Sequence, residues 1–327
     1  AMGAEVDYAG YAKKDIEIYL KNIRHHYKDL LGVSPRGSQQ GFPAGNAEHL
    51  HQIRVNARRL CNALSIYKNL FLPRQLKQWN KSIRRAVEVS SQARDLDVYI
   101  RFLNVYAGKP RGIPEREVLV SFIAALKKKR EKLQPRIIRA LDDLNKRDTF
   151  EDITRSLGRA LAADRLPSAE GSLRGGGKKD SDSRKVYKVA RKKLLHRLRE
   201  LMVLEPFVYQ PRRVQELHQM RIAAKHLRYT LEGFASLYGP RLPLFIKRVV
   251  SFHRQLGDIH DHDVWTQHLA RYARVRSRSR HEEAVLNKVK RHCLDLRQKT
   301  YRAFVRNWSR ARAGKFFEDL LEYVYAH

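Results

Sequence analysis

Apolar residues recur every three to four positions along almost the whole chain, and strand-like alternation is scarce. Ile16, Leu20 and Ile23 show this spacing near the start. Such periodicity is typical of amphipathic helices. The pattern predicts helices near residues 12–31, 47–71, 73–106, from 115 onward with a kink or break at Pro135, and over 150–163, 186–204, 213–238, 242–265, 280–308 and 316–325. We therefore predict an all-α fold.

Segments rich in Pro and Gly separate these helices. Residues 33–46 predict a long loop, and residues 108–114 a turn. From about 164 to 182 the composition changes to Pro, Ser, Gly and charge, which predicts a flexible linker. The order of elements then recurs. We expect one domain over 1–327, made of a first helical repeat (about 8–163) and a second (about 183–327), as two related four-helix bundles from an internal duplication.

Two basic helices carry the clearest sign of duplication. In each copy a histidine is followed three and seven residues later by a cation, and the copies are offset by 167 positions. The first copy holds His51, Arg54 and Arg58 beside Arg59, and the second holds His218, Arg221, Lys225 and Arg228 beside His226 and Tyr229.

On a helix, the second stripe falls within an arc of about 80°. There is no acid between His51 and Phe71, and the first acid after His218 is Glu232. A solvated charged face usually mixes both signs, and uncompensated like charge weakens a helix. A chain that carries such a face twice is expected to present it to an anion.

The composition indicates a polyanionic partner but does not identify which polyanion it is. Lys and Arg number 67 against 34 Asp and Glu, a net charge of +33. This excess produces a strong positive field, which suits nucleic acid, a phosphate polymer, an acidic membrane surface or a sulfated glycan. The two cysteines, Cys61 and Cys293, form no disulfide framework. With no signal peptide or membrane span apparent, we expect a cytoplasmic protein that does not enter a membrane.

Phosphate fits the chemistry of these faces. Arg offers a planar fork for two oxygens, and Lys a mobile point charge. Nearby cations should disfavour protonation of His51 and His218. Other basic residues expected to assist binding lie on the opening helix of each half, and these are Lys21, Arg24, Lys28, Lys188, Arg191 and Lys192.

No catalytic residue, metal ligand or cofactor is predicted. The chain has no phosphate-binding loop motif and no convincing nucleophile–base pair. The aromatic residues that flank the basic helices share the spacing of the Leu and Ile positions, so we interpret them as core rather than as base-stacking surfaces. They are Tyr67, Phe71, Phe234 and Tyr238.

A second group, rich in histidine and aspartate, allows a metal site as the alternative. It comprises His253, His260, Asp261, His262 and Asp263. Its first-half counterpart, at an offset of 166, is Asp95-Leu96-Asp97, which has no histidine nearby. The shared feature is a pair of carboxylates, and in so basic a chain these are most simply partners for Arg or helix caps.

The repeated pattern His-x-x-Arg-x-x-x-(Arg/Lys), together with Arg94-Asp95-Leu96-Asp97-Val98 and the segment Leu256 to Val264, resembles the CHAD (conserved histidine α-helical domain) family. The resemblance implies two four-helix bundles related by a pseudo-two-fold, with the basic faces lining a central channel. It also implies non-catalytic binding of inorganic polyphosphate, with a targeting or scaffolding role at polyphosphate granules. Cys61 stands where the second copy has Arg228, so we expect the second half to hold the anion more tightly.

Two other functions stay open. A nucleic-acid-binding protein would share the positive field, and nucleic acid could also be a weaker second ligand. A metal-dependent phosphohydrolase would use the histidine–aspartate group. The sequence does not give the oligomeric state or a preferred polyphosphate chain length.

Overall fold

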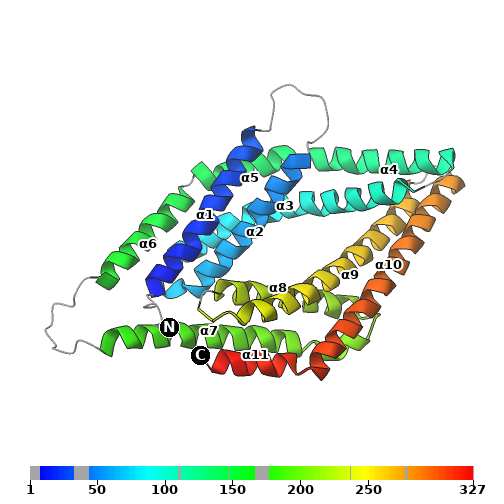
Figure 1. Cartoon of the computed structure of the whole chain (residues 1–327). Helices are drawn as coiled ribbons and strands as arrows, with labels where there is room; N and C mark the ends of the chain where they lie inside the picture. Colours follow the sequence, from blue (N-terminus) through cyan, green and yellow to red (C-terminus); the bar gives the residue numbers. More distant parts are fainter. Residues whose placement is uncertain are drawn as a thin grey trace. The chain divides into compact units, whose positions relative to one another are not determined.

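The fold is all-α, as predicted. The computed structural model describes residues 8–32, 44–109, 112–146, 148–165, 177–235, 237–276 and 279–326, and within these ranges it contains helices and no strand. The helices (Figure 1) are α1 Tyr8–Gly32, α2 Ala44–Ile66, η1 Lys68–Leu70, α3 Pro73–Ala107, α4 Ile113–Glu131, α5 Gln134–Lys146, α6 Thr149–Arg165, α7 Gly177–Met202, η2 Glu205–Tyr209, α8 Val214–Gly233, α9 Leu242–Arg276, α10 Arg280–Ala313 and α11 Phe316–Tyr325.

Helix boundaries follow local signals in the sequence. Pro73 occupies the first position of α3, where its missing N–H costs no hydrogen bond. Pro135 lies in the first turn of α5, so the chain ends α4 at Glu131 and begins a new helix rather than kinking one. At α10, Ser279 caps the helix by accepting a hydrogen bond from the Glu282 N–H at 3.1 Å.

Several predicted boundaries differ from the structure, and α9 and α10 run beyond their predicted ends to Arg276 and Ala313. The first basic helix, α2, ends at Ile66 and is followed by the short η1, while the second, α8, ends at Gly233. The Phe234 N–H then bonds the Leu231 carbonyl in a tighter turn. Helix α7 begins at Gly177, inside the segment predicted as a linker, and residues 166–176 lie outside the described ranges.

The chain divides into two compact units. Unit 1 comprises Ala1–Phe102 and Ala124–Val186, and unit 2 comprises Leu103–Ile123 and Tyr187–His327. The end of α3 and the start of α4 thus group with the second half of the chain. The two-bundle duplication stays a prediction.

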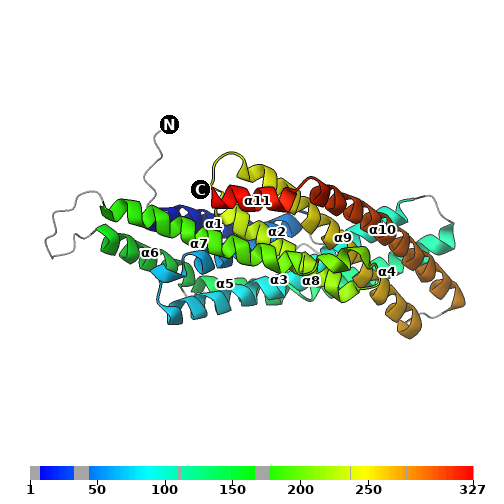
Figure 2. The ribbon, with the colours of Figure 1, turned by 90° about the horizontal axis from the view of Figure 1, so that it is seen from below.

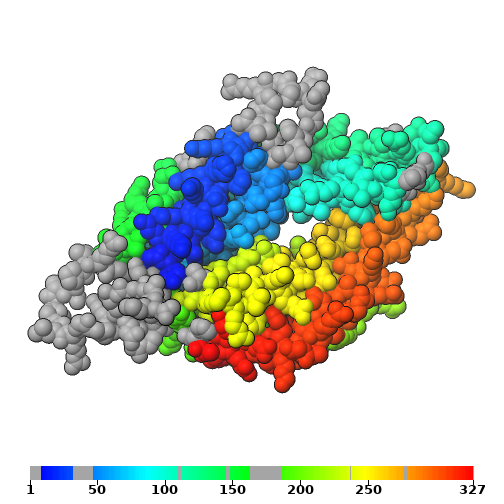
Figure 3. Space-filling view, viewed as in Figure 1, coloured from blue at the N-terminus to red at the C-terminus, as the bar shows by residue number. Residues whose placement is uncertain are grey.

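In unit 1, α2 lies beside α1, and α6 packs on the other side of α1 (Figures 1 and 3). Trp79, 2% exposed, packs edge-on to Phe71 and donates a hydrogen bond to Asp152 at 2.9 Å. Tyr67 is also buried, as predicted for core, and its hydroxyl donates to Asp15 at 2.9 Å. The basic helix α2 is therefore fixed on a packed core.

In unit 2, α9 lies between α8 and α10, and α11 runs along α7 (Figures 1 and 2). Trp308 packs against Phe252 and Phe317 and donates to Glu205 at 3.0 Å. Phe234 and Tyr238 are each 2% exposed, which confirms their prediction as core residues. In the described part of the chain, no helix is long and apolar enough to cross a membrane.

Candidate functional site

Two arginines of the basic face of α2 share one neutral hydroxyl acceptor on α3. Arg54 is 7% exposed, and its Nη2 donates to the Ser91 Oγ at 3.2 Å. Arg58 Nη2 reaches the same oxygen at 3.4 Å, while the Ser91 hydroxyl donates to the Val87 carbonyl at 2.8 Å. One serine thus orders two guanidinium groups without neutralising either charge.

His51 lies within the positive field of this face. Burial lowers its pKa, and the positive charges of Arg94, Arg54 and Arg58 lower it further, against Glu48. Burial likewise lowers the pKa of Arg94. Within the described residues, the buried Arg94 Nη1 has no hydrogen-bond partner. An anion bound here would accept that hydrogen bond and relieve the repulsion among the cations.

The basic face of α8 in unit 2 is built around a pair of histidines. The His218 and His260 Nδ1 atoms lie 3.1 Å apart, and the ring centroids 4.1 Å apart. Burial lowers the pKa of His260 to about 4, with further lowering from His218 and Arg221. Burial, then Arg221 and Lys225, lowers the pKa of His218. Both rings are therefore neutral at pH 7, with the cations supplying the charge.

Gly257 on α9 occupies the position that corresponds to Ser91 in the first half, and this difference changes the environment of Arg221. A Cβ added at Gly257 would lie 3.7 Å from the Arg221 Nε, so the guanidinium crosses α9 where that helix has no side chain. The Arg221 Nε is buried and, in the part of the chain described, has no hydrogen-bond partner. Ser91 accepts one hydrogen bond from each of Arg54 and Arg58, whereas Gly257 offers Arg221 no hydroxyl.

The sequence predicts tighter anion binding by the second half because that half has one more cation, Arg228. The structure removes this reason. Arg228 Nε pairs with Glu232 at 2.7 Å, so the cation counted as extra is already neutralised. At the corresponding Cys61, Arg84 on α3 hydrogen-bonds the thiol. Burial raises the pKa of Cys61 to about 11, against the opposing effect of Arg84. A comparison of the two basic helices in the sequence could not reveal Arg84, because Arg84 lies on another helix.

The predicted flanking cations of α1 turn toward α6 and away from the basic face of α2. Arg24 Nη2 pairs with Glu151 at 2.5 Å, and its guanidinium lies 5.7 Å from the centre of the Phe150 ring. Lys21 and Lys28 line the same pocket as Arg24. The structure does not bring these three residues together with Arg54 and Arg58.

The corresponding residues of α7 are also dispersed. The Arg191 Nη2 donates to the Tyr325 carbonyl of α11 at 3.4 Å, and Lys188 and Lys192 are exposed. Burial, with Lys225 and Arg197, lowers the pKa of His226 to about 4 against Glu200. Two of the charges that act on His226, those of Arg197 and Glu200, lie on α7. Arg59 is half-buried.

The prediction that the shared carboxylates partner arginine is confirmed for one residue of the pair in each half. Asp97 accepts from Arg130 Nε at 2.8 Å, and Asp263 accepts from Arg297 Nε at 2.7 Å. Asp97 lies on α3 and Asp263 on α9, in each half the next long helix after the basic one. They fix α3 to α4 and α9 to α10.

The histidine–aspartate group is not assembled as a metal site. Among the described residues, the one cluster with metal-ligand spacing comprises His25, His26 and Asp29 on α1. His262 is instead buried against Trp265, with ring centroids 5.2 Å apart. Sequence reasoning missed the α1 cluster, although its i, i+4 pairing of His25 with Asp29 could have indicated it.

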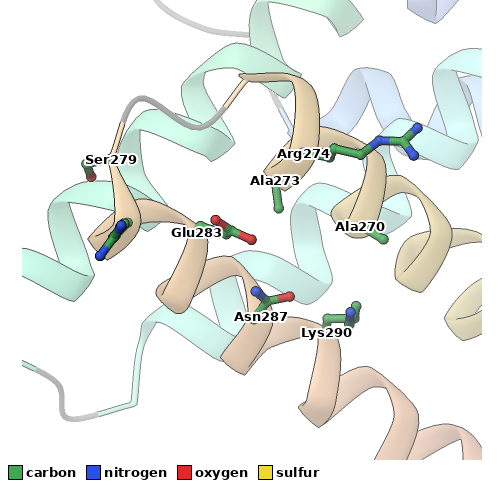
Figure 4. A pocket seen from close by; sticks show the side chains of 8 residues that line it. Ala270, Ala273, Arg274, Ser279, Glu283, Asn287 and Lys290 are labelled. Atoms are coloured by element: carbon green, nitrogen blue, oxygen red, sulfur yellow. The ribbon is translucent and has the colours of Figure 1, made fainter.

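A polar pocket between α9 and α10 is a weaker candidate for anion binding (Figure 4). Arg274, Arg280 and Lys290 line it, but Glu283 and Asn287 also project from α10 into the space between the helices. The Glu283 carboxylate would repel a phosphate there.

The fold and its two faces define a basic, all-α domain suited to an anionic ligand. The chain belongs to the CHAD domain family, whose family model matches residues 36–270. A crystal structure of the CHAD domain from the plant Ricinus communis has a TM-score of 0.60 and 19% identity, covering 94% of each chain. PptA from Streptomyces chartreusis has a TM-score of 0.56 and 16% identity, covering 92% of this chain and 98% of that one. These similarities show the fold. No curated protein sequence matches the chain.

Proposed function

We propose that this protein binds inorganic polyphosphate, without catalysis, through the basic faces of α2 and α8. The observation that carries the proposal is how the arginines are held. On α2, Ser91 orders Arg54 and Arg58 through a neutral hydroxyl, and on α8 the His218–His260 pair lies within the field of Arg221 and Lys225 and brings no negative charge to them.

The ligand's chemistry matches these faces. Polyphosphate presents regularly spaced anionic oxygens without bases or sugars. The buried donors of Arg94 and Arg221, which lack partners among the described residues, would each bond a phosphate oxygen. Binding would release counterions, so the affinity should fall steeply with salt, by a log–log slope of about one per strong phosphate contact.

Nucleic acid is the second candidate, favoured by the net charge of +33. Binding of single-stranded nucleic acid commonly uses exposed aromatic rings on which bases stack. Tyr67, Phe71, Phe234 and Tyr238, which flank the two basic helices, are all buried in the core. Phosphate contacts are therefore favoured over base contacts.

Competition between the two polyanions tests the choice of ligand. Labelled long-chain polyphosphate would be bound to the full chain and displaced by unlabelled polyphosphate or single-stranded RNA at equal phosphate content, across a salt series. We expect polyphosphate to displace the label at lower concentration at physiological salt. Better displacement by RNA would reject polyphosphate as the preferred ligand.

We also propose that the protein does not hydrolyse or transfer phosphate. Incubation with polyphosphate and Mg²⁺ or Mn²⁺ should then release no more inorganic phosphate than a protein-free control. Time-dependent release that scales with protein concentration would contradict this. A binding role fits a cytoplasmic protein that targets or scaffolds polyphosphate granules.

A further inference from the structure

Three histidines and one aspartate gather where α1 packs on α2, within unit 1. Asp29 Oδ2 lies 3.4 Å from His25 Nε2 and 3.6 Å from His49 Nδ1. The His49 Nδ1 also lies 3.2 Å from the His26 Nδ1. The cluster joins the last turns of α1 to the first turns of α2 through side chains that commonly bind transition metals.

Three of the separations among these four side chains are close to those expected around a single small cation. Zn²⁺ binds imidazole nitrogen at about 2.0–2.1 Å and carboxylate oxygen at about 2.0–2.2 Å, so neighbouring ligands of a tetrahedral site lie about 3.3–3.5 Å apart. The three short distances in the cluster, 3.2, 3.4 and 3.6 Å, bracket this range, and the ligand atoms of His25, His26 and Asp29 all lie within 4.8 Å of one another. Hydrogen bonding alone would account for one contact of His49, but a carboxylate and a second imidazole both approach its Nδ1.

The surroundings of this cluster include acids. Burial, then His25 and His49, lowers the pKa of His26, against the opposing effect of Asp29 and Glu48. The other close histidine pair, His218 and His260, has nearly the same Nδ1 separation, but the charges acting on His218 come from Arg221 and Lys225. The two ring pairs therefore differ in their surroundings, since acids oppose the lowering of the pKa at His26 and the charges named at His218 are cations.

The cluster is also separate from the proposed polyphosphate site. His49 precedes His51 by two residues, which on a helix is a rotation of about 200°. His25 is 67% exposed on its side chain, so an ion can reach the cluster from solvent. Binding of a cation there would not require the basic face of α2 to change.

We propose that His25, His26, Asp29 and His49 form a site for one divalent transition-metal ion of the Zn²⁺ class. The ion links α1 to α2 beyond the hydrogen bonds already present. Because a metal that binds only the folded state stabilises it, the bound ion raises the unfolding temperature of the chain.

Titration of the full chain, free of any added histidine tag, with Zn²⁺ and Co²⁺ tests this site. We expect about one equivalent of Zn²⁺ by calorimetry, an intense visible absorption band for tetrahedral Co²⁺, and a higher unfolding midpoint with Zn²⁺. Combining His26→Ala with His49→Ala should weaken binding at least tenfold and remove the band. If the double variant folds poorly, Asp29→Asn serves as the second test because it keeps the size of the side chain. It should also weaken metal binding.

His196→Ala is the matched control. His196 forms an i, i+4 pair with Glu200 at 3.2 Å, as His25 does with Asp29, and Glu200 is also paired with Arg197. This variant should bind metal as the unaltered chain does. Unchanged stoichiometry and affinity in both the double variant and Asp29→Asn, or no binding by the unaltered chain at micromolar Zn²⁺, would overturn the proposal.

Discussion

His218 on α8 and His260 on α9 face each other with their Nδ1 atoms 3.1 Å apart, close to the cations of the basic face. A separation this short requires one ring to donate and the other to accept, so at least one ring must be neutral. Both pKa values are lowered, first by burial and then by neighbouring positive charge. The pair is neutral at pH 7 and can gain charge when an anion arrives.

The first prediction is that polyphosphate binding takes up protons. A bound polyanion offsets the repulsion that lowers the pKa of His218 and His260, so both pKa values rise in the complex. The affinity should therefore increase as the pH falls from about 7.5 to 5.5. Calorimetry in two buffers of different ionisation enthalpy measures the protons directly. Substituting Gln for both histidines should reduce the uptake, and equal heats in both buffers for the unaltered chain would contradict the prediction.

The second prediction concerns the exchange of Ser91 and Gly257. Gly257→Ser has room for its Cβ and gives Arg221 a hydroxyl acceptor, so polyphosphate binding should weaken by about two- to fivefold while the helix becomes slightly more stable. Ser91→Gly removes the acceptor for Arg54 and Arg58 and should loosen their order. Binding isotherms of the two variants check this. Tighter binding by Gly257→Ser would mean that Arg221 needs a partner to bind anions.

The third prediction is that Asp263 serves stability rather than binding. Asp263 and Arg297 are each 12% exposed on their side chains, so Asp263→Asn should cost about 3 kcal/mol of unfolding free energy by leaving a nearly buried cation unpaired. Polyphosphate affinity at low denaturant should change less than twofold. Asp295→Asn, an exposed change two residues before Arg297, is the control for urea unfolding. A large loss of affinity with unchanged stability would place Asp263 in the binding site.

The fourth prediction is acid sensitivity through His262. Burial, then His292 and Arg297, lowers its pKa to about 4, below the usual value of 6.5. The unfolded chain therefore binds a proton that the folded chain does not, and stability is lost as the pH falls from about 6.5 toward 4, by up to about 1.4 kcal/mol per pH unit. Unfolding midpoints between pH 7 and 4.5 measure this. His262→Phe should flatten the dependence, and an unchanged slope would contradict it.

The helices were predictable because their apolar periodicity and their Pro and Gly punctuation are local. Pro73 and the span Phe316–Tyr325 agree with the structure at their boundaries. The stripes on α2 and α8 were also visible, since they depend on spacing within one helix. The roles of Asp97 and Asp263 could be predicted because a carboxylate in so basic a chain needs a cation.

What sequence could not provide were contacts from other helices. Nothing near Arg58 in sequence indicates Ser91, and nothing near Cys61 indicates Arg84. The spacing of basic residues along a helix also does not show which neighbouring helix their side chains contact. Arg24 turned out to pair with Glu151 on α6. The α1 cluster was hidden because His49 completes it from α2.

The fifth prediction, charge reversal at matched positions, tests polyphosphate binding most directly. Arg54→Glu with Arg221→Glu should abolish binding at physiological salt while the helical circular-dichroism signal survives. Because Arg54 is buried, the neutral pair Arg54→Gln with Arg221→Gln serves as a milder second variant, with binding reduced at least tenfold.

The control makes the same change of charge elsewhere, at the exposed Arg159 and Arg302, one in each unit. The measurement is the polyphosphate dissociation constant of all three variants at one salt concentration. We expect the control to bind within about threefold of the unaltered chain. Equal affinity of the Arg54/Arg221 variants and the control would contradict binding through the faces of α2 and α8.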